Sequence, residues 1–375
     1  MSRPRLGGFN EGLGVATETL AAHQSEPSAH SMFKRFVHSR GNSRALGAAA
    51  AVLLAWAGAA VAAPAGPVNP LPAAGLVCAS HDGVTCFDTA TGAVAWQALA
   101  GRQTLELAPA PGIALVAGSD GVQALELASG ARRWQLSRFG SAFPAQSDGE
   151  RAWFGTRSGH VVMLEAASGA LIWSVDLGDW VYTPALAGGR LVTGGRDARL
   201  YALDPASGAL AWDRPLEQEL VYRPVRAGAD SVLVGTFDGL VRRVAAADGQ
   251  TLWTARGPTP AYRFAVASGR AFALRMGGVL EALDLETGRT LWRYQSPRGE
   301  LTGLTARSQQ IWVAEATGRL LTLDATSGEL LAHRDLGGPL VGAPHLTPGG
   351  VLAVTATPLT LHALGDVPAT PPTKP

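Results

Sequence analysis

Short apolar runs separated by small polar turns recur along most of this chain. In residues 183–212, four such runs follow one another at 183–187, 190–194, 199–204 and 209–212. Short β-rich runs between glycine-containing turns are typical of strands joined by hairpins, and no stretch beyond the N-terminal region keeps a helical period over three turns. One unit therefore predicts four consecutive antiparallel strands.

The unit recurs with a period close to 40 residues. In most copies an apolar residue and an Asp or Glu lead into a small polar turn, which ends at a glycine and is followed four residues later by a tryptophan. The turn glycines lie 38 to 41 residues apart, at Gly92, Gly130, Gly169, Gly208, Gly249, Gly288 and Gly328. The tryptophans are Trp96, Trp134, Trp173, Trp212, Trp253 and Trp292, with Ala332 in the seventh copy. Four strands in about 40 residues correspond to one propeller blade.

This repetition predicts an all-β fold, a β-propeller of four-stranded antiparallel blades. Seven units carry the turn glycine, and an eighth begins near Ala343 and stops before a fourth strand. Residues 65–68 could supply that strand and close the ring, which would remove open sheet edges. We therefore expect eight blades, with seven as the alternative. A tryptophan on each outer strand can pack between blades and donate its indole N–H to a neighbouring carbonyl, so we expect the six tryptophans to dock the blades.

The region before the repeats has the pattern of an export signal. Residues 1–31 form a polar upstream extension, which leaves Met1 and Met32 both open as start sites. Residues 32–63 combine a basic segment, an apolar run at 45–60 and a small-residue cleavage site, as a signal peptide does. We expect cleavage and a periplasmic location; a retained anchor is the alternative, because the apolar run approaches spanning length. No cysteine follows closely, so we expect no lipid anchor.

The expected domain order is then a propeller at residues 64–366 and a Pro-rich, disordered tail at 367–375. The two cysteines, Cys78 and Cys86, flank a segment with a hairpin turn at 81–83. Directly opposed residues of two paired strands can approach closely enough for a disulfide. In an oxidising compartment we expect Cys78 and Cys86 to be bonded, with two buried thiols as the alternative.

Charge and side-chain chemistry exclude several functions. Beyond residue 63 the chain has 25 basic and 27 acidic residues, which gives no general attraction for nucleic acid. The histidines of this region are scattered over different repeats and show no metal-ligand spacing with Cys, Asp or Glu. We expect no metal, no membrane span after cleavage, and a monomer.

The stretches at 202–208 and 282–288, each followed by a tryptophan, resemble the tryptophan-docking repeats of the pyrroloquinoline-quinone family of β-propellers. The resemblance covers about residues 70–365. The family includes quinoprotein dehydrogenases, whose pattern implies a vicinal Cys-Cys pair and a calcium site that uses asparagine. This chain has no Cys-Cys pair, and beyond residue 63 its sole asparagine is Asn69, before the blades. We therefore expect neither pyrroloquinoline quinone nor calcium, and no enzyme.

The same family includes the BamB-type scaffolds of outer-membrane protein assembly, which the loss of tryptophan at Ala332 also resembles. The resemblance implies a periplasmic scaffold that binds protein partners, with the outer-membrane assembly machinery as the candidate partner. The alternative is a propeller that binds a small molecule or quinone cofactor, and a quinoprotein dehydrogenase is the least favoured reading.

One repeated feature exceeds what the fold requires. Tyr182, Tyr222 and Tyr262 are spaced by 40 residues, just before the inner strands of successive units. We expect them at the mouth of the central channel, where Tyr and Arg are typical of binding hot spots. The binding hypothesis comprises Trp180, Tyr182, Tyr222, Arg223, Tyr262 and Arg263. The alternative is that each tyrosine fills the narrow neck of a blade.

Overall fold

The computed structural model describes residues 71–73, 75–88, 90–340, 343–346, 352–356 and 360–364. All of them belong to one compact unit, Asn42–Pro375. The upstream extension, the signal peptide, the strand expected at 65–68 and the C-terminal tail lie outside these residues. Every regular element that the structure describes is a β-strand, which confirms the all-β expectation.

The first sheet contains six strands in chain order. They are β1 (Leu71–Ala73), β2 (Leu76–Asp88), β3 (Val94–Ala110), β4 (Ile113–Gly118), β5 (Gly121–Glu126) and β6 (Arg132–Leu136).

Five four-stranded antiparallel sheets follow. The first two comprise β7 (Gln146–Ser147), β8 (Arg151–Gly155), β9 (His160–Glu165) and β10 (Leu171–Asp176), then β11 (Ala185–Ala187), β12 (Arg190–Gly194), β13 (Arg199–Leu203) and β14 (Leu210–Pro215). The third comprises β15 (Val225–Arg226), β16 (Ser231–Gly235), β17 (Leu240–Ala245) and β18 (Thr251–Arg256). The last two comprise β19 (Ala261–Ala267), β20 (Arg270–Arg275), β21 (Val279–Asp284) and β22 (Thr290–Gln295), then β23 (Leu301–Arg307), β24 (Gln310–Glu315), β25 (Arg319–Asp324) and β26 (Leu330–Asp335). The final sheet has β27 (His345–Leu346), β28 (Leu352–Ala356) and β29 (Thr360–Leu364).

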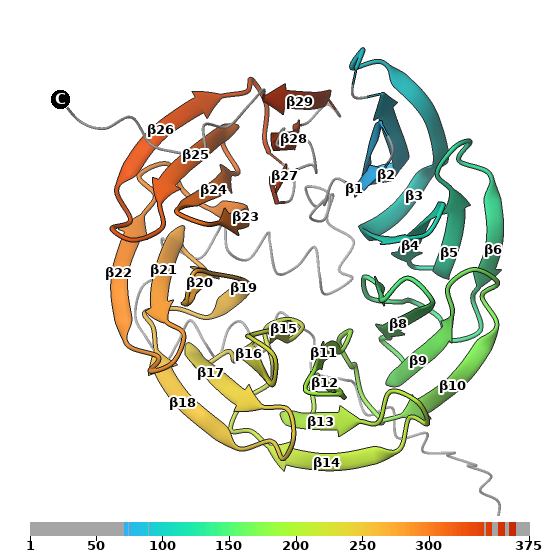
Figure 1. Ribbon diagram of the computed structural model, residues 1–375, viewed down its shortest axis with the longest axis horizontal. Coiled ribbons are helices and arrows are strands. Elements are labelled where there is room, and N and C mark those ends of the chain that lie inside the picture. Colours follow the sequence, from blue (N-terminus) through green and yellow to red (C-terminus); the bar gives the residue numbers. More distant parts are fainter. Residues whose placement is uncertain are drawn as a thin grey trace, which may run out of the picture. The chain divides into compact units, whose positions relative to one another are not determined.

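These sheets succeed one another around a ring within the unit, with β10, β14, β18, β22 and β26 on the outside (Figure 1). The described strands form seven sheets, so the propeller has seven blades and the expectation of eight is wrong. The reason lies in β3, which at 17 residues is long enough to pair with β2 at one end and with β4 at the other. The first two sequence units therefore share one sheet instead of making two.

The hydrophobic core lies between neighbouring sheets. One cluster joins Leu115 of β4 to Phe154 of β8 and Leu164 of β9, all buried. Another joins β12 and β13 to β16 and β17 of the next sheet. The two middle strands of each four-stranded sheet are therefore buried on both faces, as stacked blades require.

Six tryptophans each form a hydrogen bond with the following sequence unit: Trp96 of β3 does so within the first sheet, and the other five link an outer strand to the next sheet. Their indole Nε1 atoms donate hydrogen bonds to carbonyl oxygens at distances of 2.8 to 3.2 Å. Each acceptor lies three residues before the turn glycine of the next unit. The donor–acceptor pairs are Trp96–Leu127, Trp134–Ala166, Trp173–Pro205, Trp212–Ala246, Trp253–Leu285 and Trp292–Ala325.

The turn glycine is required by the tryptophan that packs against it. Gly208 has a φ of +74°, and a Cβ built on it would lie 2.8 Å from the ring of Trp173. Both the backbone conformation and the contact therefore exclude a larger residue. The turn itself is closed by Asp204, whose Oδ1 accepts hydrogen bonds from the Ala206 and Ser207 amides.

The outer strand β26 differs from the other outer strands of the four-stranded sheets. Ala332 stands where they carry a tryptophan, and all six residues of β26 are exposed. The joint between β26 and the final sheet therefore lacks the indole contact that the five preceding joints between sheets have.

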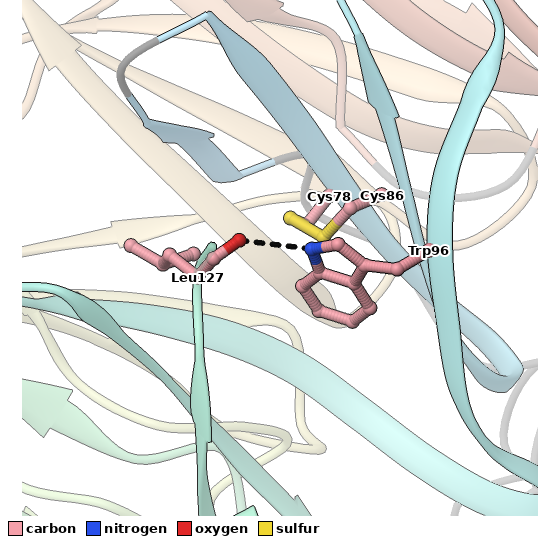
Figure 2. The surroundings of a disulfide bond; sticks show 4 residues. All are labelled: Cys78, Cys86, Trp96 and Leu127. Atoms are coloured by element: carbon pink, nitrogen blue, oxygen red, sulfur yellow. Dashed lines mark hydrogen bonds between the residues drawn. A yellow bond between two sulfur atoms is a disulfide. The ribbon is translucent and has the colours of Figure 1, made fainter. Parts of the chain in front are cut away.

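The predicted disulfide between Cys78 and Cys86 is present, and both residues are buried. Eight extended residues would span roughly 26 Å, whereas the two Cα atoms are 3.9 Å apart, so β2 reverses direction between them. Cys86 pairs with Trp96 in the β2–β3 ladder, which places the disulfide beside the first docking indole (Figure 2).

We expect Trp212→Ala to lower the free energy of unfolding by about 3–5 kcal/mol, because it removes a buried ring and leaves a cavity between blades. The control is Leu210→Ala on the same strand, whose side chain is 53% exposed and should contribute less than about 0.5 kcal/mol. Urea unfolding followed by far-UV circular dichroism checks both values. Equal losses for the two variants would contradict the docking role.

The double variant Cys78→Ala/Cys86→Ala should lose about 2–3 kcal/mol, because a closed loop of this length restricts the unfolded chain modestly. Urea midpoints measured with and without a reductant give the comparison. The reductant should lower the midpoint of the wild type and leave that of the double variant unchanged. If the urea midpoint of the wild type is the same with and without the reductant, the Cys78–Cys86 disulfide does not stabilise the fold.

Candidate functional site

The candidate site is built on segments that cross from the outer strand of one sheet to the inner strand of the next. The crossing before β11 is held from both sides, because the Val181 amide donates to the Thr156 carbonyl (3.1 Å) and the Tyr182 amide to the Gly194 carbonyl (3.0 Å). The next crossing repeats this pattern, with the Val221 amide donating to Gly235 (2.9 Å). Backbone pairing thus fixes where each aromatic side chain points.

Three of these crossings contribute a row of aromatic rings that contact one another. Phe143 and Tyr182 have ring centroids 4.9 Å apart, and Tyr182 and Tyr222 lie 5.8 Å apart in an edge-to-face arrangement. Such pairs stabilise beyond the area they bury. We call Phe143, Tyr182 and Tyr222 the aromatic row.

The tyrosines are packed inside the ring. Tyr182 and Tyr222 are buried, and the Tyr182 hydroxyl donates to the Val221 carbonyl (3.4 Å) of the following crossing. Tyr262 does not join the aromatic row; its hydroxyl donates to the Leu301 carbonyl of the next sheet. Burial raises the pKa of Tyr182 to about 12, so its hydroxyl stays protonated at neutral pH.

The aromatic row ends at a cluster of three charges. Glu106 Oε2 accepts a hydrogen bond from Arg223 Nη2 and its Oε1 accepts one from Arg263 Nη1, each at 2.8 Å. The guanidinium carbons of Arg223 and Arg263 lie 5.6 and 5.8 Å from the ring centre of Tyr222. We call Glu106, Arg223 and Arg263 the channel triad.

The channel triad spans the centre of the ring. Glu106 belongs to β3 in the first sheet, Arg223 precedes β15, and Arg263 lies in β19. Two whole sheets stand between β3 and β15 along the chain, and β3 and β19 lie on opposite sides of the ring (Figure 1). Side chains from such separated strands can meet only across the central channel.

The two arginines of the channel triad control the ionisation of Glu106. Burial alone would raise the pKa of Glu106, but the Arg223 and Arg263 cations outweigh burial and hold that pKa below its ordinary value. Glu106 is therefore ionised at neutral pH. Its single negative charge is shared between two arginines.

A second cluster lies around Trp180, which is partly exposed. The guanidinium carbons of Arg196 and Arg157 lie 3.6 and 4.9 Å from the centre of the Trp180 ring. Burial lowers the pKa of Arg157, and the nearby Arg196 cation lowers it further. We call Trp180, Arg157 and Arg196 the cationic platform.

Hairpin turns position the cationic platform. Arg157 follows β8 and Arg196 follows β12, each in the turn that leads to the third strand of its sheet. The Arg196 amide donates to the Trp180 carbonyl at 3.1 Å. A Cβ on the neighbouring Gly195 would overlap that carbonyl, so a glycine is needed for the approach.

The structure thus divides the six residues of the binding hypothesis. Four of them meet in the ring centre: Tyr182, Tyr222, Arg223 and Arg263. Trp180 lies beside this group, with its ring centroid 6.1 Å from that of Phe143 in an edge-to-face arrangement. Tyr262 packs instead against Val221 and Met276. Glu106, Arg157 and Arg196 were missed from the sequence. A charged residue between two leucines in a strand was the available signal for Glu106.

The described residues hold no group of three His, Cys, Asp or Glu side chains placed to bind a metal ion. Among them there is also no helix with the length and apolar character needed to cross a bilayer. The arrangement offers stacked rings and guanidinium groups, which suit recognition of anionic or aromatic groups.

We expect Glu106→Gln to lower the free energy of unfolding at pH 7 by about 3–5 kcal/mol, because two largely buried guanidinium groups lose their counter-ion. Because the pKa of Glu106 is lower in the folded protein than in the unfolded chain, its ionised carboxylate stabilises the fold at any pH above the unfolded pKa. This stabilisation is lost as the pH falls through the folded pKa. The difference between wild type and variant should therefore shrink as the pH falls below 4.5, the ordinary value.

The matched control is Glu126→Gln, because Glu126 pairs with Arg133 at the surface. An exposed pair of this kind contributes less than about 1 kcal/mol. Urea unfolding of both variants between pH 3 and pH 7 is the measurement. A pH-independent loss for Glu106→Gln would show that its charge is not what stabilises the ring.

Comparison with known proteins places this geometry in a family. The profile of the family described as outer membrane protein assembly factor BamB matches residues 54–174, 157–279 and 275–365. A curated relative, the outer membrane protein assembly factor BamB of Moranella endobia (strain PCIT), is 28% identical over 137 residues. That match covers 32% of this chain and 35% of the relative, so it spans about a third of the relative's length.

Solved structures share the fold. BamB from Moraxella catarrhalis superposes with a TM-score of 0.65 at 21% identity, over 79% of this chain and 93% of that one. The computationally designed Ika8 protein gives 0.71 at 15% identity, over 80% and 96% of the two chains. Sqt1 of Saccharomyces cerevisiae gives 0.67 at 12% identity, over 80% and 96%. Because the family profile matches most of the chain, the chain belongs to the BamB family of β-propellers, as the resemblance of its repeats indicated.

Proposed function

We propose that this chain is a non-catalytic scaffold of the cell envelope that binds protein partners during outer-membrane protein assembly. Membership of a family described by that process supports the proposal. In this proposal the chain is exported to the periplasm by the signal peptide expected at residues 32–63. Its partners belong to the outer-membrane assembly machinery.

The proposed contact surface is the cationic platform, and this is the observation that carries the proposal. Trp180 offers a partly exposed ring, and Arg157 and Arg196 hold guanidinium groups against it. Trp and Arg are the residues most enriched at binding hot spots, and a stacked arginine loses little further freedom when it binds. In this reading the buried aromatic row and channel triad keep the surface rigid from within.

The test is recovery of partners from cell envelopes by the tagged full chain. The double variant Trp180→Ala/Arg196→Ala should recover at least about tenfold less of the barrel-assembly proteins, because truncating a hot spot costs 2 kcal/mol or more. The control double variant Leu252→Ala/Arg289→Ala removes an exposed apolar residue and an exposed arginine elsewhere.

Thermal unfolding of each purified variant shows that the fold is kept. Recovery of barrel-assembly proteins by the wild type and the control, but not by the platform variant, supports the proposal. Equal recovery by all three would remove the cationic platform from the contact surface. Wild-type protein that recovers no barrel-assembly component would overturn the function itself.

A further inference from the structure

The channel triad has an uncompensated positive charge. Glu106 supplies one carboxylate, while Arg223 and Arg263 supply two guanidinium groups. The side chains of Glu106, Arg223 and Arg263 are 3%, 17% and 10% exposed, so all three are largely removed from water. No other ion pair involves either arginine in the part of the chain that the structure describes. A largely buried site with a net charge of +1 is unfavourable unless an anion balances it.

One donor of the channel triad is unused. Arg263 Nη1 binds Glu106, but Arg263 Nη2 is buried and has no hydrogen-bond partner among the described residues. Arg263 as a whole is 9% exposed. A guanidinium group presents its N–H groups as a planar fork that fits a carboxylate, and a buried donor without an acceptor is destabilising.

We propose that the channel triad binds one carboxylate group, which accepts hydrogen bonds from Arg263 Nη2 and from the Arg223 guanidinium. The ring of Tyr222, which lies beside both guanidinium groups, forms the apolar wall of the site. The carboxylate belongs either to a free small acid or to an acidic side chain of a polypeptide. This inference goes beyond the proposed function and does not depend on it.

The charge balance selects the class of ligand. A single carboxylate brings the cluster to a net charge of zero, whereas the phosphate dianion, which predominates above about pH 7, would leave a buried excess of negative charge. In a site largely removed from water such an excess is strongly unfavourable. The site should therefore prefer a monoanionic carboxylate to phosphate.

The experiment measures thermal unfolding of the purified chain at about pH 8, where phosphate is mainly the dianion, in sodium acetate against sodium chloride and sodium phosphate at matched ionic strength. A ligand that binds only the folded state raises Tm by about 2–3 °C for each tenfold increase above its Kd. We expect acetate to raise Tm in this way and chloride and phosphate not to do so. Equal Tm values in acetate and chloride overturn the proposal, and a larger rise in phosphate overturns the selectivity.

Three variants identify the site. Arg263→Gln should abolish the response to acetate, whereas Arg298→Gln, which removes an arginine that is 54% exposed, should keep it. Glu106→Gln should show a larger rise in acetate than the wild type, because acetate then replaces the missing carboxylate. If Arg263→Gln does not fold, Glu106→Gln decides: an unchanged or smaller response to acetate overturns the assignment.

A further arm separates the two sources of the carboxylate. The capped peptide Ala-Glu-Ala is compared with the capped peptide Ala-Gln-Ala in the same assay. A rise with the glutamate peptide alone assigns a carboxylate that a polypeptide can deliver, and a rise with acetate alone assigns a free small acid. No rise with either overturns the proposal, while partner recovery through the cationic platform would be unaffected.

Discussion

An indole packed against a turn glycine joins each of the first five sheets to the sheet that follows, and the remaining architecture depends on this contact. The tryptophan reaches the neighbouring unit only because the turn glycine has no side chain and accepts a positive φ. A register shift just before the tryptophan, such as the one between Ala202 and Leu203 opposite Trp212, orients the ring. Five repetitions of the contact between neighbouring sheets fix the angles between these sheets, and the angles decide which side chains meet in the centre.

Local patterns predicted local structure well. The repeat period, the turn glycines and the cysteine pair each depend on residues close together in the chain, and these gave the all-β propeller and the Cys78–Cys86 bond. The predicted number of blades was wrong because β3 is long enough to pair with strands of two sequence units. The turn motif does not reveal the length of the strand that follows it. A repeat count is therefore not a sheet count.

The candidate site was predictable only in part, for a related reason. The 40-residue spacing of Tyr182 and Tyr222 indicated a shared place near the channel, and the two rings do pack edge to face. Glu106 could not be paired with Arg263 in the same way, because 157 residues separate them and their contact exists only after the ring closes. The platform arginines occupy ordinary turn positions, where sequence alone indicates a solvated side chain.

The joint after β26, which has no docking tryptophan, bears on the structural role of the channel triad. Around the ring, the sheet of β23–β26 and the sheet of β27–β29 lie between the sheet with Arg263 and the sheet with Glu106 on one side, and this joint lies within that stretch (Figure 1). Ala332 provides no indole there, so local opening of the ring should concentrate at this place. The ion pair between Glu106 and Arg263 links, across the central channel, the two sheets that flank this stretch of the ring. The channel triad therefore ties together the part of the ring in which an indole contact is missing.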